Sequence, residues 1–367
     1  WMPSSTVLLC LRRSREECAS SLSCLKVALS REVIFFMSAG KYSDIPMSAP
    51  KVVIVTPAPT GSRAGNRNTA LRWAGILRKL GCRVRVATQW DGQRCDLLVA
   101  LHARKSHEAL RDFRARQPDS PALLALTGTD LYRDIREDAR AAASLDMATG
   151  LIVLQEAALA ELTPQQRRKT RAIHQSVATS LRAAPPRRKF RICVLGHLRD
   201  EKDPFCTAKA LPWLSDSQVE VVQAGRSLAQ TMTRQAARHM RADSRYRWLG
   251  ELPHWAALRL LSRSQVMVIS SRMEGGAHVV SEAIAIGVPV IASDIPGNRG
   301  LLGSDYPAYY PVGDAVRLAE LLRQAIEDRA FLSRLAAAVR RRRALVDPCR
   351  EILAWKTLLR EAGVSSG

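Results

Sequence analysis

Two glutamates separated by seven residues stand in a segment that is otherwise small and apolar. The apolar run Val266–Ser270 predicts a buried strand, and Gly275–Ala277 predicts a turn with little side-chain bulk. Glu274 lies in that turn, and Glu282 lies about one turn into a helix that we expect to begin near His278. The free amides at the start of a helix favour an anion, so the segment suits a diphosphate flanked by two carboxylates. A sugar nucleotide, with hydroxyl groups on either side of a diphosphate, fits this spacing.

The elements that would position these residues form two series in which strands alternate with helices. The first series of expected strands is Val52–Val55, Arg83–Ala87, Asp96–Leu101, Ala122–Leu126, Gly150–Leu154 and Arg171–His174. The second series is Arg191–Leu195, Val219–Val222, Arg247–Leu249, Val266–Ser270 and Val288–Ala292. Expected helices include Asn68–Leu80, Ser106–Arg116, Gln155–Leu162 and Arg350–Glu361. Continuous Val, Ile and Leu strands between helices predict parallel sheets that are covered on both faces.

The two series are separated by a linker, Ala183–Lys189, whose composition is rich in proline and arginine. We therefore expect an N-terminal Rossmann-like domain at 48–182 and a C-terminal one at 188–348, followed by a helical segment at 349–367. Residues 1–47 are rich in serine and cysteine and differ from the rest of the chain. We interpret them as an upstream, loosely attached extension, with Met47 as the natural start.

Composition excludes several classes of protein. The chain has 367 residues and a formal net charge of +22, but its arginines are spread along its length and aromatic residues make up only 5%. This pattern disfavours nucleic-acid binding, while the positive charge would attract anionic small molecules. No apolar run is long enough to span a membrane. The eight cysteines show no metal-binding or disulfide spacing, so we expect no metal and a cytoplasmic location.

Polar residues follow three expected strands of the first series, and the carboxyl ends of parallel strands share one edge of a sheet. After the first strand we expect a polar loop that extends to the helix at Asn68. These candidate residues are Gly61, Arg63, Asn66, Arg67 and Asn68 in that loop, His102, Arg104 and Lys105 after the third strand, and Thr127, Thr129, Asp130 and Arg133 after the fourth. Arginine offers a planar fork that suits phosphate oxygens. An ordinary solvated loop or a packing histidine is the alternative at each position.

The segment that carries Glu274 and Glu282 resembles the donor site of GT-B glycosyltransferases of family 4, where an E-x7-E pair occupies the same strand, loop and helix. The resemblance implies an α/β protein with the GT-B fold, in which two Rossmann-like domains face each other across a cleft and the last helix crosses back to the N-terminal domain. It also implies a set of residues that bind a nucleotide sugar. They are Gly61, Arg199, Lys202, Gly225, Arg226, Leu249, Gly250, Glu274, Gly275, Gly276, Ala277 and Glu282.

The segment Val194–Pro204 departs from the family 4 pattern. His197 stands where that family usually has an arginine, Asp203 replaces a glycine, and Arg199 can take the arginine's place. The absence of a D-x-D motif disfavours a metal-dependent glycosyltransferase of the GT-A type.

From about Lys51 onward the chain resembles, more narrowly, the selenosugar synthase (SenB) family of selenoneine biosynthesis. The resemblance is carried by TPAPTGSRAGNRNTALRWAGILRKLG, LHARKS, LTGTDLY, LGHLRDEKDPF and SSRMEGGAHVVSEAIAIGVPV. It implies transfer from UDP-N-acetylglucosamine or UDP-glucose to selenophosphate, which yields a 1-selenosugar, UDP and phosphate without a cofactor. It also implies a functional link to an enzyme that makes selenophosphate and to a later enzyme that forms selenoneine.

The residues are compatible with such an acceptor. A hydroxyl acceptor must lose a proton as it attacks, whereas selenophosphate brings an ionised nucleophile and instead needs cations beside the donor diphosphate. The candidates for binding the acceptor phosphate are Arg63, Asn66, Arg67, Lys105, Thr127, Thr129 and Arg133, and Arg272 and Arg299 are further candidates at the edge of the cleft. The candidates for catalytic assistance are His102, Asp130, His278 and Glu274. A family 4 enzyme with a saccharide or lipid hydroxyl acceptor, and a non-catalytic basic protein that binds nucleic acid, are the alternatives.

Overall fold

The computed structural model describes residues 49–62, 65–215 and 218–364. The predicted extension at 1–47 and the candidate Arg63 lie outside these described residues. Two six-stranded sheets, all of whose strand pairs are parallel, organise the described chain. We call residues 49–172, around the first sheet, the N-terminal lobe and residues 190–346, around the second sheet, the C-terminal lobe.

The first sheet has the strand order β2-β1-β3-β4-β5-β6. Its strands are β1 (Lys51–Val55), β2 (Arg83–Ala87), β3 (Leu97–Leu101), β4 (Ala122–Leu126), β5 (Gly150–Val153) and β6 (Thr170–Ala172). Side chains alternate between the two faces of a strand, and both faces of β1 are buried. Val53 and Val55 pack in one apolar cluster, while Val52 and Ile54 pack in another on the opposite face. This explains why the strand is a continuous apolar run.

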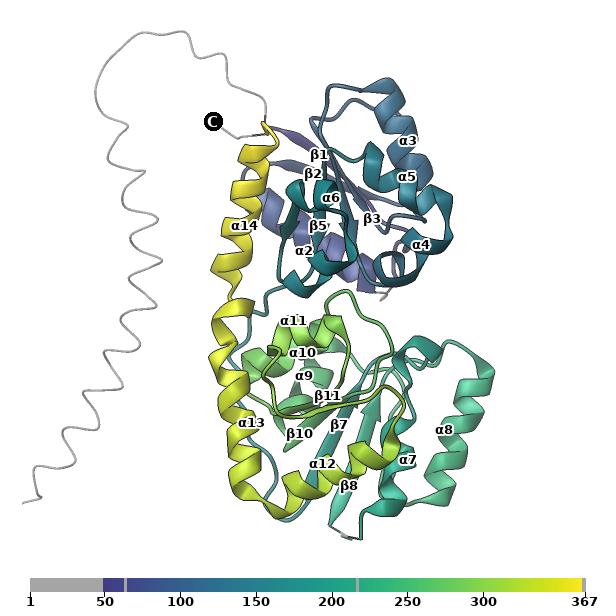
Figure 1. Cartoon of the computed structure of the whole chain (residues 1–367), viewed down its shortest axis with the longest axis vertical. Coiled ribbons are helices and arrows are strands. Elements are labelled where there is room, and N and C mark those ends of the chain that lie inside the picture. Colours follow the sequence, from purple (N-terminus) through teal and green to yellow (C-terminus); the bar gives the residue numbers. More distant parts are fainter. Residues whose placement is uncertain (1–48, 63–64, 216–217, 365–367) are drawn as a thin grey trace, which may run out of the picture. The chain divides into compact units, whose positions relative to one another are not determined.

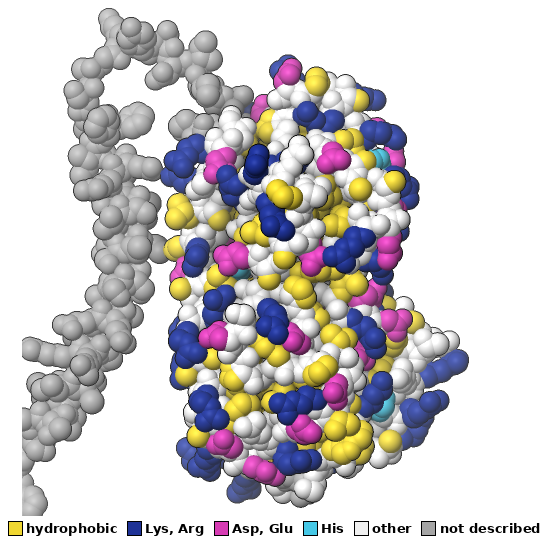
Figure 2. All heavy atoms as spheres, viewed as in Figure 1, with side chains coloured by type: hydrophobic (Ala, Val, Ile, Leu, Met, Phe, Trp, Pro, Cys, Tyr) yellow, Lys and Arg dark blue, Asp and Glu magenta, His cyan; other side chains and the backbone are white. Residues whose placement is uncertain are grey.

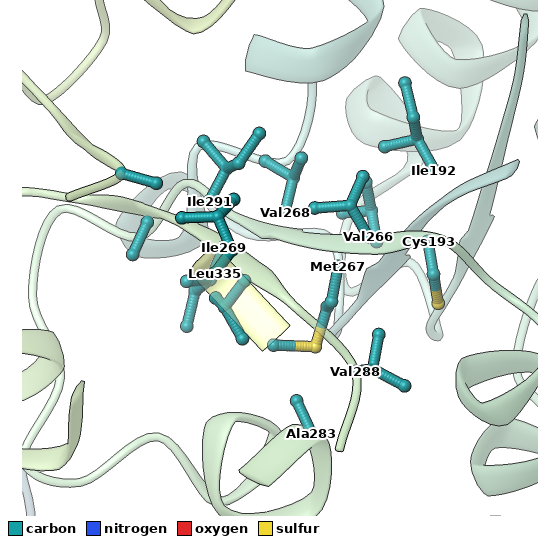
Figure 3. Packing of buried hydrophobic residues seen from close by; sticks show 14 of the residues in the cluster. Ile192, Cys193, Val266, Met267, Val268, Ile269, Ala283, Val288, Ile291 and Leu335 are labelled. Atoms are coloured by element: carbon teal, nitrogen blue, oxygen red, sulfur yellow. The ribbon is translucent and has the colours of Figure 1, made fainter. Parts of the chain in front are cut away.

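The second sheet has the strand order β12-β11-β10-β7-β8-β9. Its strands are β7 (Phe190–Leu195), β8 (Val219–Ala224), β9 (Tyr246–Trp248), β10 (Val266–Ile269), β11 (Val290–Ser293) and β12 (Tyr309–Tyr310). Figure 3 shows the packing at its centre, where Met267 and Ile269 of β10 lie among apolar side chains from the strands and from helices that include Ala283 and Leu335.

Helices cover both faces of each sheet. The N-terminal lobe carries α2 (Gly65–Lys79), α3 (His107–Arg116), α4 (Ile135–Glu137), α5 (Ala139–Met147) and α6 (Pro164–Arg168). The C-terminal lobe carries α7 (Cys206–Ala210), α8 (Gln230–Ala242), α9 (His254–Ser262), α10 (His278–Ile286), α11 (Pro296–Leu302), α12 (Ala315–Glu327) and α13 (Arg329–Arg341). The last helix is α14 (Pro348–Glu361). Short helical turns are η2 (Asp130–Asp134), η3 (Glu156–Glu161), η4 (Asp200–Lys202), η5 (Leu211–Trp213) and η6 (Arg343–Val346).

Helix α14 packs on the first sheet although it follows the C-terminal lobe in sequence (Figure 1). Its Trp355 is fully buried, and the Trp355 ring lies edge-on to Trp73 of α2 with centroids 5.0 Å apart. Leu358 and Leu359 join the same apolar cluster as β1. Burial of two tryptophans against each other ties the end of the chain to the N-terminal lobe.

Most predicted strands begin and end within one or two residues of the observed ones, but two predictions about helices were wrong in detail. Helix α2 begins at Gly65, so Asn66, Arg67 and Asn68 lie in its first turn and not in a loop. Glycine and asparagine are weak helix formers, which hid this first turn. The segment predicted as a helix at Gln155–Leu162 is the 3₁₀ helix η3.

The strand order changes direction at one point in each sheet, which is where ligands bind in open parallel α/β sheets. In the first sheet this point lies between β1 and β3, and in the second between β7 and β10. The segments that leave the carboxyl ends of β7 and β10 carry Lys202 and Glu274.

The face of the molecule in Figure 2 shows lysine and arginine side chains scattered among acidic and apolar ones, without a single basic patch. In the described part of the chain, every helix is too short or too polar to cross a membrane.

Candidate active site

Two predicted donor residues meet where the strand order of the second sheet reverses. The Lys202 ammonium group forms an ion pair with Glu274, and Ser271 Oγ donates a hydrogen bond of 2.6 Å to the same carboxylate oxygen. The backbone of this turn is fixed by Ser270, whose hydroxyl donates to the carbonyl groups of Lys202 and Asp203 at 3.0 and 2.8 Å. A largely buried carboxylate and ammonium are therefore held together at the carboxyl ends of β7 and β10.

Glu282 is 4% exposed, and two histidines surround its carboxylate. His254, the first residue of α9, donates from Nε2 to Glu282 Oε1 at 2.7 Å, and His278 Nε2 lies 3.6 Å from the same oxygen. The hydrogen bond to Glu282 raises the pKa of His254, whereas burial lowers the pKa of His278 to about 4. Sequence reasoning missed His254. The feature of the sequence that could have indicated His254 is its position at the start of the helix that follows β9.

Arg72 of α2 connects this carboxylate to the N-terminal lobe, and it too was missed. Its Nη2 lies 2.7 Å from His278 Nε2, and its Nη1 donates to the Ser176 carbonyl. Glu351 of α14 lies 3.8 Å from the Arg72 Nη1 atom. The guanidinium thus joins three segments that are far apart in sequence.

The glycine turn after Glu274 contacts loops of the N-terminal lobe. A Cβ atom on Gly275 would lie 2.5 Å from the Thr127 carbonyl group, and one on Gly276 would lie 2.6 Å from the Leu154 side chain. Both distances are shorter than real Cβ contacts allow. The lack of side chains therefore permits the predicted anion-binding turn to pack on the segments that leave β4 and β5.

The other predicted donor residues occupy strand ends of the C-terminal lobe. Gly225 follows β8 and touches the Gly196 backbone so closely that a Cβ atom would lie 1.8 Å from its carbonyl oxygen. The Arg226 amide donates to His197 Nδ1 at 3.2 Å. Leu249 is 39% exposed, and Gly250 has a positive φ of 70°. Arg199 lies 3.9 Å from Glu201 in an exposed pair, so its cation is accessible to a ligand.

The structure changes the interpretation of Asp130. Its side chain is fully buried and accepts hydrogen bonds from the amides of Thr127, Gly128 and Ala103 at 2.9, 2.8 and 3.0 Å. Through these hydrogen bonds the Asp130 carboxylate holds the loops after β3 and β4 in place. Asp130 therefore fixes the local backbone, and the prediction that it assists chemistry directly does not suit this geometry.

His102 lies at the carboxyl end of β3 in an uncommon conformation. It is one of two non-glycine residues with positive φ in the described chain, at 78°, and it is 3% exposed. Its Nε2 lies 3.2 Å from Thr129 Oγ1. Burial lowers the pKa of His102, so the imidazole is neutral near pH 7. Strained backbone of this kind is often kept at functional sites.

Several predicted phosphate-binding cations already have acidic neighbours. Arg104 and Arg133 both pair with the buried Asp134, at 3.0 and 3.1 Å. Arg299 pairs with Asp294, and Arg272 lies 3.6 Å from Asp203.

Lys105 forms no ion pair with any residue that the structure describes. It lines a cavity of about 540 Å³ at the ends of β1, β2 and β3, together with Arg104, Arg140, Pro57, Thr88, Gln89, Glu108 and Ala109. Arg104 and Arg140 pair with Asp134 and Asp138, so Lys105 is the cation of this cavity that has no acidic partner among the described residues.

Comparison with known families gives a match over the segment that carries the candidate donor residues. Residues 181–342 match the model of the family described as glycosyl transferases group 1. A glycogen synthase of Mycobacterium tuberculosis is 30% identical over 151 residues, which are 40% of this chain and 36% of that protein. The chain thus spans about a third of the length of the curated relatives that it matches. The family model covers most of the C-terminal lobe, and the glycogen synthase match covers 40% of this chain.

Solved structures show that the fold is GT-B, as the sequence predicted. HepE from Anabaena in complex with UDP-glucose aligns with a TM-score of 0.67 at 15% identity, covering 85% of this chain and 98% of that one. Sucrose-phosphate synthase from Thermosynechococcus elongatus aligns with a TM-score of 0.72 at 18% identity, covering 87% and 100%. At these identities the likeness concerns the fold alone.

Proposed function

We propose that this chain is a glycosyltransferase that uses a UDP-sugar. The observation that carries this proposal is the placement of Lys202, Glu274 and Glu282 around the strand-order reversal of the C-terminal lobe. The match of residues 181–342 to glycosyl transferases group 1, and the structural neighbour HepE that was solved with UDP-glucose, support the same donor class. Glu282 would bind the ribose hydroxyls, and Glu274 would position the sugar.

The diphosphate would lie between the Lys202 ammonium group and the amides of Gly276 and Ala277. In the ligand-free chain Lys202 pairs with Glu274, so the donor would replace this carboxylate as the partner of the ammonium group. Glu274 would then be free to accept a hydrogen bond from the sugar. The charge that grows on the leaving diphosphate would be stabilised by groups that are already in place.

The acceptor that we propose is selenophosphate. A cavity at the strand ends of the N-terminal lobe, lined by Lys105 and by the aspartate-paired Arg104 and Arg140, supports an anionic acceptor. The activity would stand between a reaction that supplies selenophosphate and one that consumes a selenosugar. The proposed reaction uses no cofactor and no metal ion.

The reaction has two bond-breaking steps. In the first, ionised selenium attacks C1 of the sugar, the C1–Se bond forms, and the C1–O bond breaks with its electron pair leaving on UDP. In the second, water attacks phosphorus and the Se–P bond breaks with its electron pair on selenium, which releases phosphate. The first step needs no protein base, so positioning and charge stabilisation supply the catalysis. Neutral His102, which lies at the carboxyl end of β3 beside Thr129, is our candidate to assist the water.

Product analysis tests this function. After incubation with UDP-glucose or UDP-N-acetylglucosamine and selenophosphate, mass spectrometry should detect a hexose or N-acetylhexosamine that carries selenium, and the anomeric proton coupling should indicate a β-linkage. A product that forms only when a saccharide or lipid hydroxyl is supplied would favour the family 4 alternative. We expect selenium to attack C1 from the face opposite UDP, which converts an α-linked donor into a β-linked product, so an α-linkage would contradict this mechanism.

A further inference from the structure

Arg67 is a buried cation that has no matching anion in the described chain. Its side chain is 7% exposed, and neither Nε nor Nη1 finds a hydrogen-bond acceptor. Among the residues that the structure describes, it is the only arginine or lysine with such buried, unsatisfied nitrogens. An unpaired buried charge is strongly unfavourable, and arginine cannot escape by losing its proton. A group of this kind in a native chain calls for an explanation, and a bound anion would satisfy these donors.

The position of Arg67 on α2 shows where its guanidinium group lies. Arg67 shares the buried face of this helix with Ala70 and Ala74, which are fully buried against the first sheet. Long side chains on a helix point back toward its N-terminus. The N-terminus of α2 follows β1, so the guanidinium group points toward the carboxyl end of β1, beside the point where the strand order of the first sheet reverses.

The surroundings of this helix start favour an anion. The first turn of α2 contains no acidic residue, so the partial positive charge of the helix start adds to that of Arg67. Among the described residues, Cβ atoms added to Gly61 or Gly65 would meet no atom within 4 Å, so the space beside these two backbone positions is open. A buried guanidinium group, the positive end of a helix and open space together form the elements of an oxyanion site.

We propose that Arg67 and the first turn of α2 bind a phosphoryl group of a substrate. This inference rests on the proposed function for the identity of the substrates, and it adds a phosphate ligand from the N-terminal lobe to the Lys202 site of the C-terminal lobe. The phosphoryl group can belong to the donor diphosphate or to the acceptor phosphate, which share the chemistry that a guanidinium fork recognises.

Three variants test the role of this side chain. Arg67→Met removes the charge at similar length, Arg67→Lys keeps the charge without the fork, and Arg78→Met is the control. Arg78 lies in the last turn of the same helix, where it is exposed and donates to the Val84 carbonyl. Calorimetry with UDP, inorganic diphosphate and thiophosphate measures binding, and thermal unfolding without ligand measures stability.

We expect Arg67→Met to weaken binding of at least one probe by about tenfold or more, because a charge-assisted bidentate contact is lost. The same variant should unfold at an equal or higher temperature than the wild type without ligand, since it removes an unpaired buried charge. The affinity of Arg67→Lys for the probes should lie between those of the wild type and Arg67→Met, and the affinity of Arg78→Met should match that of the wild type. Weaker binding of UDP and diphosphate would assign the site to the donor, and weaker binding of thiophosphate alone would assign it to the acceptor.

A structural role predicts the opposite pattern. Lower stability of Arg67→Met, with unchanged affinity for all three probes, would overturn the inference, and so would a wild-type chain that binds none of them. The proposed function fails separately: a wild-type chain that binds diphosphate through Arg67 but does not bind UDP would contradict the UDP-sugar donor and leave the anion site intact.

Discussion

At the scale of single residues, the two donor carboxylates differ in their present partners. Glu274 is paired with a lysine that the substrate diphosphate can attract away, whereas Glu282 accepts a hydrogen bond from His254 and lies 3.6 Å from His278. The first arrangement suits a group that changes partners when substrate binds. The second suits a fixed acceptor, because the hydrogen bond from His254 orients the carboxylate before any ligand arrives.

Glu282→Ala should weaken binding of UDP by about 10- to 100-fold, since hydrogen bonds to a charged group contribute about 1.5–3 kcal/mol. Glu274→Ala should leave the affinity for UDP within about threefold of the wild type but reduce sugar transfer, because UDP lacks the sugar. Calorimetry with UDP separates the two, and Glu320→Ala, which removes an exposed partner of Arg317, serves as the control. Wild-type affinity in Glu282→Ala would refute the ribose assignment.

His278 should make the folded chain less stable in acid. Burial lowers its pKa to about 4 in the folded state, whereas an unfolded chain titrates near ~6.5. Between these values the unfolded state binds more protons, so the free energy of unfolding falls as pH decreases from about 6.5 to about 4. His278→Gln should reduce this decline in urea titrations at several pH values.

His254 provides the opposite control. Its raised pKa contributes stability that is fully present below about 6.5 and is lost as pH rises through the folded-state pKa. The difference in unfolding free energy between the wild type and His254→Gln should therefore shrink with increasing pH. For His278, an equal dependence of the unfolding free energy on pH in His278→Gln and in the wild type would contradict the lowered pKa of this residue.

At the scale of elements, the glycine turn sets how closely the C-terminal lobe packs on the loops after β4 and β5. Gly275→Ala should destabilise the chain by about 1–3 kcal/mol, the usual cost of overpacking, and should reduce sugar transfer. Gly75→Ala is the matched control, because its Cβ would meet no atom within 4 Å inside helix α2. It should stabilise the chain by about 0.5–1 kcal/mol. Equal stability of the two variants would contradict the packing described for this turn.

The start of α14 is held by a buried carboxylate. Glu351 is 2% exposed and accepts from Trp73 Nε1 at 3.2 Å and from the Ser176 amide and hydroxyl at 2.8 and 2.5 Å. Glu351→Ala should lower the free energy of unfolding by about 3–5 kcal/mol, because it leaves buried donors and Arg72 without this partner. Glu361→Ala at the exposed end of the same helix should change it by at most about 1 kcal/mol. Urea unfolding compares the two, and similar losses would contradict the anchoring role.

The sequence predicted what depends on local pattern and missed what depends on distant contacts. Apolar runs and turn residues located the strands and placed Glu274 and Glu282 on the correct loop and helix, because both are local features. Arg72 and His278 are 206 positions apart, and Trp73 and Glu351 are 278 positions apart, so no spacing rule could join them. The sequence also could not predict that three backbone amides donate hydrogen bonds to Asp130, because these bonds depend on how the loops after two strands meet.

At the scale of the whole molecule, the positive charges that matter to the proposed function are those on side chains that are buried or that line a cavity. Most surface arginines with known partners form exposed pairs, which contribute little to stability. The cations that matter to the proposed chemistry are fewer: Lys202 beside Glu274, Lys105 in its cavity, and the unpaired Arg67. They lie at or beside the carboxyl ends of the strands of the two sheets, where parallel α/β proteins bind their ligands.

The most direct test of the central proposal is the rate of UDP release from UDP-glucose and UDP-N-acetylglucosamine with and without selenophosphate. The account predicts that selenophosphate, or thiophosphate as its sulfur analogue, increases the rate by about tenfold or more over water alone, through transfer to a preorganised nucleophile. Saccharides and inorganic phosphate should not increase it. UDP release that ignores selenophosphate but responds to a saccharide or lipid acceptor would contradict the proposed acceptor.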